Sequence, residues 1–218
     1  CAKCGFGDQP LLEPSAWVAV HRMREFAPQH LANTAWAFAT LAVRNRPLFD
    51  AISCRALPTI SLFSAQDLAT TAWSYAVLVV QDAPLRDAMS SGALAKLRDF
   101  APQNITNMMW SMAKLALPDL PLLEALSSAA VAKIAELVPQ DISNPSWALA
   151  TLAVTDPPFL ATMAAAALRS LGSFKRQEMS NTAWALAKLG WTDRPLMDAM
   201  SATIVASIGD YEPQDLAS

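Results

Sequence analysis

The apolar and polar residues of this chain follow the spacing of helices. The first clear apolar stripe is Leu31, Ala35, Phe38, Ala39 and Ala42. These positions lie three and four residues apart, as on one face of an α-helix. We therefore predict a helix over about 28–43, which Pro28 opens because proline suits the first helical position. After a short polar link, a second helix is predicted from Pro47 to about Phe63.

The same two-helix pattern recurs along the chain with a period of 37 residues. Three residue types keep this spacing without insertions: Trp36, Trp73, Trp110, Trp147 and Trp184; Gln29, Gln66, Gln103, Gln140, Gln177 and Gln214; Pro10, Pro47, Pro84, Pro121, Pro158 and Pro195. Three independent markers with one period indicate an array of helical hairpins. In the second unit, Ser64 and Asp67 have the spacing of a capping box.

An all-α fold follows from this pattern, and we expect a right-handed α-solenoid. One amphipathic hairpin cannot bury its apolar face alone, whereas stacked hairpins cover one another. The hand is expected from similar helical-hairpin arrays. The predicted units form one array without separate domains: a partial repeat at 1–26, repeats at 27–63, 64–100, 101–137, 138–174 and 175–211, and the start of a further repeat at 212–218.

Some aromatic and proline residues need their own interpretation. The tryptophans of the repeat lie beside alanines, so we expect them to pack in the core, although exposed rings would stack on bases. Trp17 and Trp191 fall outside that phase and are expected to be partly exposed. Pro58 and Pro145 lie inside predicted helices, where proline kinks a helix or costs about 3 kcal/mol. Each is either a tolerated kink or a deliberate bend.

Composition limits where the protein acts. The chain has 218 residues, 53% of them hydrophobic, and a mean hydropathy of +0.25. No apolar run reaches the ~18–20 residues of a membrane helix, and we see no signal peptide, so we expect neither a membrane span nor secretion. The first residue is Cys1 rather than Met, and the chain stops inside a predicted helix. We expect either a piece of a longer array or a processed chain.

The residues that carry most enzyme chemistry are scarce. Cys1 and Cys4 have CxxC spacing, but a zinc site needs two further ligands and Cys54 is the only other thiol. The six glycines form no phosphate-binding loop, and no nucleophile or metalloprotease motif occurs. We therefore expect no enzyme activity, no metal, no cofactor and no small-molecule substrate.

A second, mostly polar stripe runs along the first helix of each unit and supplies the candidate binding residues. They are Asn33, Thr34, Thr40, Thr70, Thr71, Ser74, Asn107, Met108, Ser111, Lys114, Asn144, Thr151, Asn181, Thr182 and Lys188. In a solenoid this helix of every unit lines one concave wall. Helical repeats can read single-stranded RNA at one base per repeat with two or three side chains, so five units would span about five nucleotides. Alternatively, short polar residues simply cover a solvent-facing side.

The unit "PQxLANTAWAxAxL…PLxxAI" resembles the heptatricopeptide and octotricopeptide repeats of organelle proteins, which often accompany a RAP domain. The resemblance covers about Pro10 to Ser218. It implies RNA binding in mitochondria or plastids, in transcript maturation, translation or rRNA assembly. By position, the implied base-facing residues are Asn33, Thr34, Thr70, Thr71, Asn107, Met108, Asn144, Asn181 and Thr182.

Two functions remain open at this stage. One is a single-stranded RNA or rRNA binder that uses the concave wall. The other is a protein–protein scaffold, or a peripheral subunit of a large organellar complex. The net charge of −3 and the pI of about 5.3 show no overall basic bias of the kind nucleic-acid binders usually have. A positive concave wall would favour RNA, and a neutral or negative wall would favour a protein partner.

Overall fold

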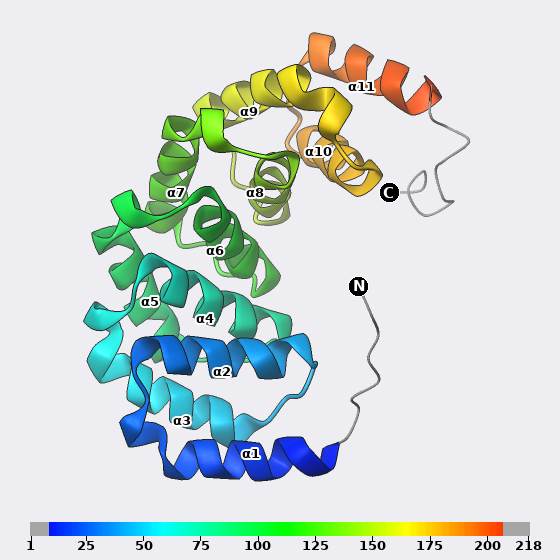
Figure 1. Cartoon of the computed structure of the whole chain (residues 1–218). Helices are drawn as coiled ribbons and strands as arrows, with labels where there is room; N and C mark the ends of the chain where they lie inside the picture. Colours follow the sequence, from blue (N-terminus) through cyan, green and yellow to red (C-terminus); the bar gives the residue numbers. More distant parts are fainter. Residues whose placement is uncertain (1–8, 207–218) are drawn as a thin grey trace.

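The computed structural model describes residues 9–206 and confirms the all-α class (Figure 1). Within that range the chain forms eleven α-helices and five short 3-10 helices, and it contains no strand. Five α-helices form an inner layer: α2 (Pro28–Thr40), α4 (Ala65–Val77), α6 (Pro102–Lys114), α8 (Pro139–Thr151) and α10 (Arg176–Lys188). Six form an outer layer: α1 (Gln9–His21), α3 (Arg46–Ala56), α5 (Ala83–Ala95), α7 (Leu120–Ala132), α9 (Pro157–Ser170) and α11 (Arg194–Ala206).

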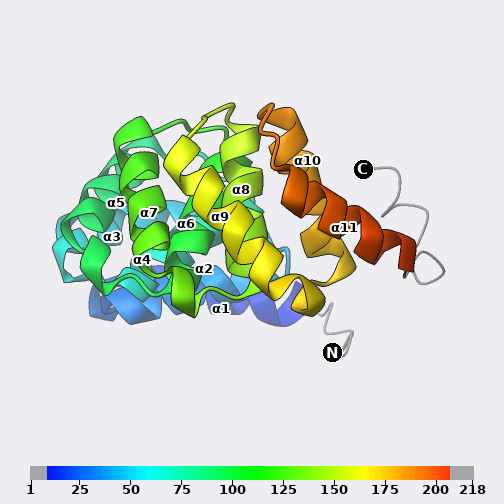
Figure 2. The ribbon, with the colours of Figure 1, turned by 90° about the horizontal axis from the view of Figure 1, so that it is seen from above.

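The two layers are bent into an arc. Each inner helix packs against the next inner helix, and the outer helices cover the convex side. Seen from above, the outer helices α5, α7, α9 and α11 follow one another side by side (Figure 2). This packing is consistent with a solenoid. It leaves one side of every inner helix on the inside of the arc, and we call this surface the concave wall.

The helices begin where local side chains satisfy the free backbone N–H groups. Before each of five outer helices, a side-chain oxygen accepts a hydrogen bond of 2.9–3.2 Å from the N–H three residues later. These capping residues are Asn45, Asp82, Asp119, Asp156 and Asp193. Such caps stabilise a helix by about 1 kcal/mol each. The predicted capping box is confirmed, because Ser64 and Asp67 bond each other's backbone N–H at 2.9 and 3.1 Å.

Each inner helix ends in a turn that requires one residue with positive φ. After α2, the N–H of Val43 bonds the carbonyl of Phe38 at 2.9 Å, and Ala42 bonds Ala39 at 3.0 Å. This pair of bonds is the Schellman motif, in which the residue after the helix adopts the left-handed conformation. The five residues in that conformation are Ala42, Val79, Ala116, Ala153 and Gly190, with φ between 52° and 65°. Only the last is glycine, so four of these turns carry backbone strain.

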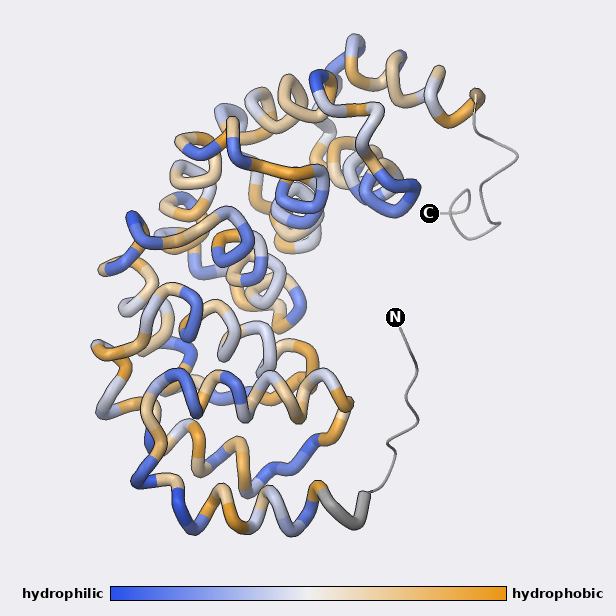
Figure 3. The backbone as a smooth tube through the Cα atoms, viewed as in Figure 1, coloured by the Kyte–Doolittle hydropathy of each residue, from blue (hydrophilic) through white to orange (hydrophobic). Residues whose placement is uncertain are grey.

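The core lies between the layers and between neighbouring inner helices. Large apolar side chains such as Phe49, Phe100 and Phe159 are fully buried between the layers. The inner helices meet one another largely through small residues such as Ala35 and Ala72, which are also buried. Hydrophilic residues recur on the inner helices and in the connecting turns (Figure 3). The close approach of the inner helices leaves little volume for a large ring between them.

Two predicted helix boundaries are wrong. The helix predicted over 28–43 ends at Thr40, because the Schellman turn follows. The helix predicted from Pro47 to Phe63 is divided: α3 ends at Ala56, and a 3-10 helix, η2, covers Leu57–Leu62. Similar 3-10 turns follow α1, α5, α7 and α9: η1 (Met23–Glu25), η3 (Leu97–Asp99), η4 (Ile134–Glu136) and η5 (Leu171–Ser173).

The two unusual prolines have different surroundings. Pro58 does not interrupt an α-helix, since it lies at the start of η2, where its missing N–H costs nothing. Pro145 does lie inside α8 and is buried. The helical assignment nevertheless continues through it from Pro139 to Thr151.

Candidate nucleic-acid interface

Three side chains of every inner helix form a stripe along the concave wall. A glutamine near the start of the helix is followed four residues later by asparagine or threonine, and three residues later by tryptophan. Positions i, i+4 and i+7 share one face of a helix. The five sets form a glutamine row (Gln29, Gln66, Gln103, Gln140, Gln177), an asparagine row (Asn33, Thr70, Asn107, Asn144, Asn181) and a tryptophan row (Trp36, Trp73, Trp110, Trp147, Trp184).

These rows surround a hollow of about 610 Å³ on the wall. Its volume falls in the range of ligand-binding clefts, ~300–1,000 Å³. The lining residues come from four inner helices and the residue before α10: Trp73, Asn107, Trp110, Gln140, Asn144, Trp147, Lys175, Gln177, Glu178 and Asn181. Amide groups and indole rings therefore dominate its chemistry.

The prediction that the phased tryptophans pack in the core is right only in part: Trp73 and Trp147 are partly buried against the core, but no ring of the row is fully buried. Trp36 is 50% exposed, and the other four rings of the tryptophan row are half-buried. The rings of Trp73 and Trp110 lie 6.5 Å apart between centroids, with a 32° angle between their planes. The physical reason is space, since buried alanines bring neighbouring inner helices too close for an indole. The expectation for the two other rings is confirmed, because Trp17 is 63% exposed and Trp191 is half-buried.

One ring of the tryptophan row is in contact with a lysine side chain of the same helix. The ammonium nitrogen of Lys188 lies 4.7 Å from the centroid of the Trp184 ring, in the range of a cation–π interaction. Both residues belong to α10 and lie four residues apart, so they share a face of the helix. This lysine therefore places positive charge directly beside an aromatic surface of the wall.

The structure separates the predicted binding residues into two groups. Ten are at least partly accessible: Asn33, Thr34, Thr40, Thr70, Asn107, Lys114, Asn144, Thr151, Asn181 and Lys188. Five are buried, and their expected place on the wall is wrong: Thr71, Ser74, Met108, Ser111 and Thr182. Thr71, Met108 and Thr182 each follow a member of the asparagine row by one residue. One step along a helix turns the side chain by about 100°, which points it at the neighbouring inner helix.

Several hydroxyl groups of this set are bonded within their own helix. Ser74 donates to the carbonyl of Thr70 at 2.7 Å, and Ser111 donates to Asn107 at 2.6 Å. Thr182 donates to the carbonyl of Glu178 at 2.8 Å. Such bonds to the carbonyl four residues earlier occupy the hydroxyl proton. These groups therefore satisfy the helix rather than a ligand.

A further polar position of the wall is used to start the inner helices. The third residue of each helix accepts a hydrogen bond of 2.7–3.3 Å from the N–H of the residue before the helix. These residues are His30, Asp67, Asn104, Asp141 and Glu178. Their side chains vary because an imidazole, a carboxylate or an amide can each accept this bond. Their variation thus reflects capping.

The concave wall is formally close to neutral. The five inner helices contain three basic residues, Lys114, Arg176 and Lys188, and three acidic residues, Asp67, Asp141 and Glu178. These charges cancel within the helices, but Asp141 is buried and bonded to Thr106, and Lys175, just before α10, adds a positive charge to the hollow. A strand bound here would be held by stacking and hydrogen bonds more than by charge.

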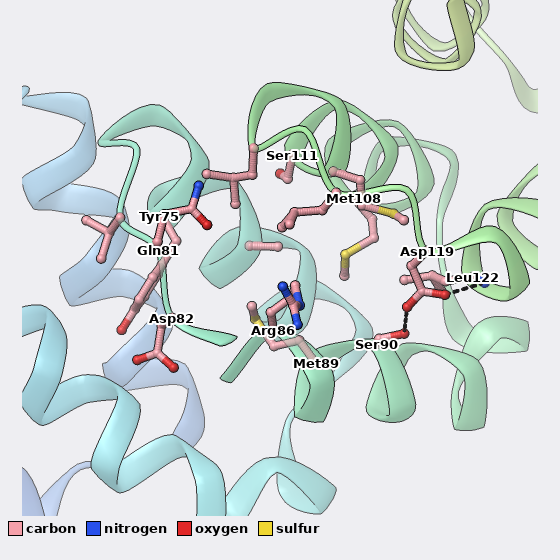
Figure 4. Close-up of a pocket in the computed structure, with 15 residues that line it drawn as sticks. Tyr75, Gln81, Asp82, Arg86, Met89, Ser90, Met108, Ser111, Asp119 and Leu122 are labelled. Carbon is pink, nitrogen blue, oxygen red and sulfur yellow. Dashed lines mark hydrogen bonds between the residues drawn. The ribbon is translucent and has the colours of Figure 1, made fainter. Parts of the chain in front are cut away.

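A second, apolar cavity of about 50 Å³ lies between α4–α5 and α6–α7 (Figure 4). Methionines at 89, 108 and 112 and the ring of Tyr75 contribute to its lining. Arg86, two residues after Pro84, also lines it. The equivalent residues of α3, α7 and α9 also lie two positions after the repeated proline. They are Phe49, Leu123 and Leu160, which are fully buried. The arginine instead pairs with exposed Asp87 at 2.7 Å. The cavity therefore marks a packing defect.

Within residues 9–206, no group of three or more histidine, cysteine or acidic side chains has the geometry of a metal site. The CxxC pair at Cys1 and Cys4 lies outside the described residues, as does the further repeat predicted at 212–218. Among the described helices, none is long and apolar enough to span a membrane.

Comparison with protein families identifies the chain. Residues 8–134 match the family model described as RNA-editing substrate-binding complex 6 protein, RESC6. The match covers more than half of the 218 residues. The chain belongs to the RESC6 family. No curated protein matches it in sequence.

Membership of the RESC6 family corrects the resemblance to heptatricopeptide and octotricopeptide repeats, which is wrong. It also gives no support to a plastid location. Phased prolines reflect how the helices of a hairpin array begin, a physical need that is not confined to one repeat family. The RESC6 description is compatible with a component of an RNA-editing complex and with RNA or protein partners.

Sequence reasoning missed two of the three rows on the wall. The glutamine row was recognised only as a marker of the repeat, and the tryptophan row was expected in the core in preference to stacking on bases. A signal was available: each tryptophan follows a member of the asparagine row by three residues, which places it on the same helical face. The tryptophans were nevertheless assigned to the core, because large apolar rings are usually buried.

Proposed function

We propose that this RESC6-family protein binds single-stranded RNA along its concave wall. The observation that carries the proposal is the hollow in which half-buried indoles alternate with amides from four inner helices. Stacking of a base on an aromatic side chain contributes about 1–3 kcal/mol and accepts any base. Amides offer both a donor and an acceptor to a base edge. The family match to a component of RNA-editing machinery supports RNA as the ligand.

The proposal includes the organisation of the array. We take the repeat to be a 37-residue hairpin with the unit bounds predicted from sequence, and the superhelix to be right-handed. The inner helices begin at residues 28, 65, 102, 139 and 176, which supports that unit. We further propose that the protein works in the mitochondrion and acts by binding, without catalysis of its own.

Titration of a fluorescent 20-nucleotide single-stranded RNA with the protein, followed by anisotropy, tests the proposal. Trp110→Ala and Trp147→Ala should each weaken binding by about 5- to 100-fold, from the free energy of one stacked base. Trp147→Phe should keep most of the affinity because it keeps an aromatic face. Trp17→Ala is the matched control, since this exposed ring lies on outer helix α1 and stacks on His21 at 3.8 Å. Absence of saturable binding at low salt would refute the proposal.

A second candidate is a protein partner on the same wall. The formal neutrality of the inner helices favours it, because nucleic-acid surfaces usually carry positive charge. In that case Trp110→Ala and Trp147→Ala would abolish capture of other subunits of an RNA-editing complex. The RNA titration of the unmodified protein would then show no binding.

A further inference from the structure

We infer that the concave wall holds single-stranded RNA without reading the order of its bases. This inference rests on the proposed function and concerns the ligand class of the same surface. A positional code requires that accessible, base-contacting side chains differ from unit to unit. Only positions of the wall that are both accessible and variable could supply such a code.

The accessible rows are nearly uniform. The glutamine row has the same residue, exposed, in all five inner helices, and the tryptophan row is also invariant. In the asparagine row, only Thr70 departs from asparagine. Four of the five units thus offer the same two amides and the same ring to a nucleotide, and the second unit replaces one amide with the hydroxyl of Thr70. These four units have no side chain in these rows that would make one prefer a different base from its neighbour.

Two of the variable positions are mostly buried or engaged in helix capping. Four of the five residues that follow the asparagine row are buried: Thr71, Met108, Pro145 and Thr182. The fifth, Thr34, is half-buried, and its hydroxyl donates to the carbonyl of His30 at 2.7 Å. The five capping residues of the inner helices vary from histidine to glutamate, yet each bonds the N–H before its own helix. Glu178 is the one capping residue that also lines the hollow, and one of its oxygens is occupied by the bond to the N–H of Lys175. Variation at these two positions therefore reflects packing and capping more than contact with a base.

Another variable row lies near the end of each inner helix: Thr40, Val77, Lys114, Thr151 and Lys188. The hydroxyl of Thr40 donates to the carbonyl of Trp36 at 2.9 Å, and the hydroxyl oxygen of Thr151 is buried. Val77 has no hydrogen-bonding group in its side chain. The lysines are mobile point charges suited to phosphate rather than to a base edge. This row therefore tunes affinity but does not read sequence.

The side chains that face the ligand can accept any of the four bases. A glutamine or asparagine amide presents a carbonyl acceptor and an NH₂ donor, and rotation exchanges them. Every base has at least one donor or acceptor to match, and every base has a face for an indole. We expect unstructured single strands to be the ligand class, whatever their base order.

The test compares two RNAs that share one composition but differ in order. Ten-nucleotide strands of adenine and cytosine only, one with blocks and one scrambled, avoid internal pairing. The full chain should bind both with affinities within about two-fold. A difference of ten-fold or more, about 1.4 kcal/mol, would overturn the inference while leaving RNA binding intact. If neither RNA binds, the proposed function itself fails.

Variants sharpen the comparison. Asn144→Ala should weaken both RNAs by the same factor, and Thr70→Asn, which completes the asparagine row, should strengthen both by the same factor. A change in the ratio of the two affinities would indicate positional reading and would contradict the inference. Ser128→Ala on the exposed side of outer helix α7 is the control and should change neither affinity.

Discussion

The phenolic hydroxyl of Tyr75 in inner helix α4 donates a hydrogen bond of 2.7 Å to the main-chain carbonyl of Phe49 in outer helix α3. The two rings meet edge to face, with 4.9 Å between centroids. Both side chains are buried. This contact ties one layer to the other at a point where most of the packing is purely apolar.

Replacement of Tyr75 by phenylalanine should lower the free energy of unfolding by about 1 kcal/mol, the net value of one hydrogen bond. The ring and its apolar contacts remain, so the change isolates the hydroxyl group. Urea denaturation followed by circular dichroism at pH 8 measures the difference. An unchanged denaturation midpoint would show that this hydrogen bond makes no net contribution to the free energy of unfolding.

The contribution of Tyr75 should depend on alkaline pH. Burial, and secondarily the negative charges of Asp82 and Asp50, raises the pKa of Tyr75 well above its ordinary value of about 10. Above pH ~10 the unfolded chain ionises this group while the folded chain does not, so stability falls as pH rises. At pH ~11 the loss is about 1.4 kcal/mol, which removes the advantage of the wild type over Tyr75→Phe. Urea titrations of both proteins at pH 8, 10 and 11 measure this convergence, and a constant difference would contradict it.

The left-handed turns after the inner helices supply a matched pair of substitutions. Val79 has φ of 52°, a strained value for a β-branched residue, and is 46% exposed. Val79→Gly should therefore raise the free energy of unfolding by about 0.5–1 kcal/mol, after the greater freedom of glycine in the unfolded chain is subtracted. Gly190→Val should lower it by about 1–2 kcal/mol. No atom lies within 4 Å of an added Cβ at Gly190, so only the backbone contributes. Thermal melts of both variants measure the effect, and a lower Tm for Val79→Gly would refute the strain.

Arg86 occupies a position at which α3, α7 and α9 bury an apolar side chain. Arg86→Leu should fill the adjoining cavity of about 50 Å³, which at about 24 cal/mol per Å³ corresponds to a gain of about 1.2 kcal/mol. The exposed ion pair with Asp87 that is lost contributes little. Arg86→Gln removes the charge without filling the space and serves as control. Equal stability of the two variants in urea denaturation would show that the cavity carries no cost.

The near-neutral concave wall predicts a weak dependence of RNA binding on salt. Single strands show a slope of log K against log salt of about −0.7 for each phosphate contacted by a cation. Lys114, Lys175 and Lys188 are exposed lysines on or beside the wall, so we expect a slope of about −2. Lys188→Ala should make the slope shallower by about 0.7. Titrations between about 50 and 200 mM salt measure it, and a slope near −6 would reveal a basic surface elsewhere.

Helix type and most helix starts were predictable from local signals. Pro28, Pro102 and Pro139 open inner helices as expected, because proline fits the first turn without losing a hydrogen bond. The helix ends were less predictable, since alanine or valine fills four of the five turns where glycine is the usual signal. The 3-10 helices after the outer helices lack a distinct apolar spacing of their own, so they were absorbed into longer predicted helices.

The site was predicted only in part because local spacing does not reveal how closely helices approach. The asparagine row was assigned to the wall, and its members are accessible. Thr71, Met108 and Thr182 were assigned there too, although tight packing of the inner helices buries them. The same tight packing keeps Trp110 and the other rings of the row from full burial, although Trp73 and Trp147 pack partly against the core. Both errors thus have one physical cause, the small residues at the contact between inner helices.

The uniform rows of the concave wall have a mechanical consequence. If every unit makes the same contacts, a strand shifted by one nucleotide meets an equivalent environment, so several alignments have nearly equal energy. The barrier between them is only that of breaking and remaking a few stacks. A long transcript would then diffuse lengthwise through the arc while staying bound, and would present successive segments to whatever acts at its exit.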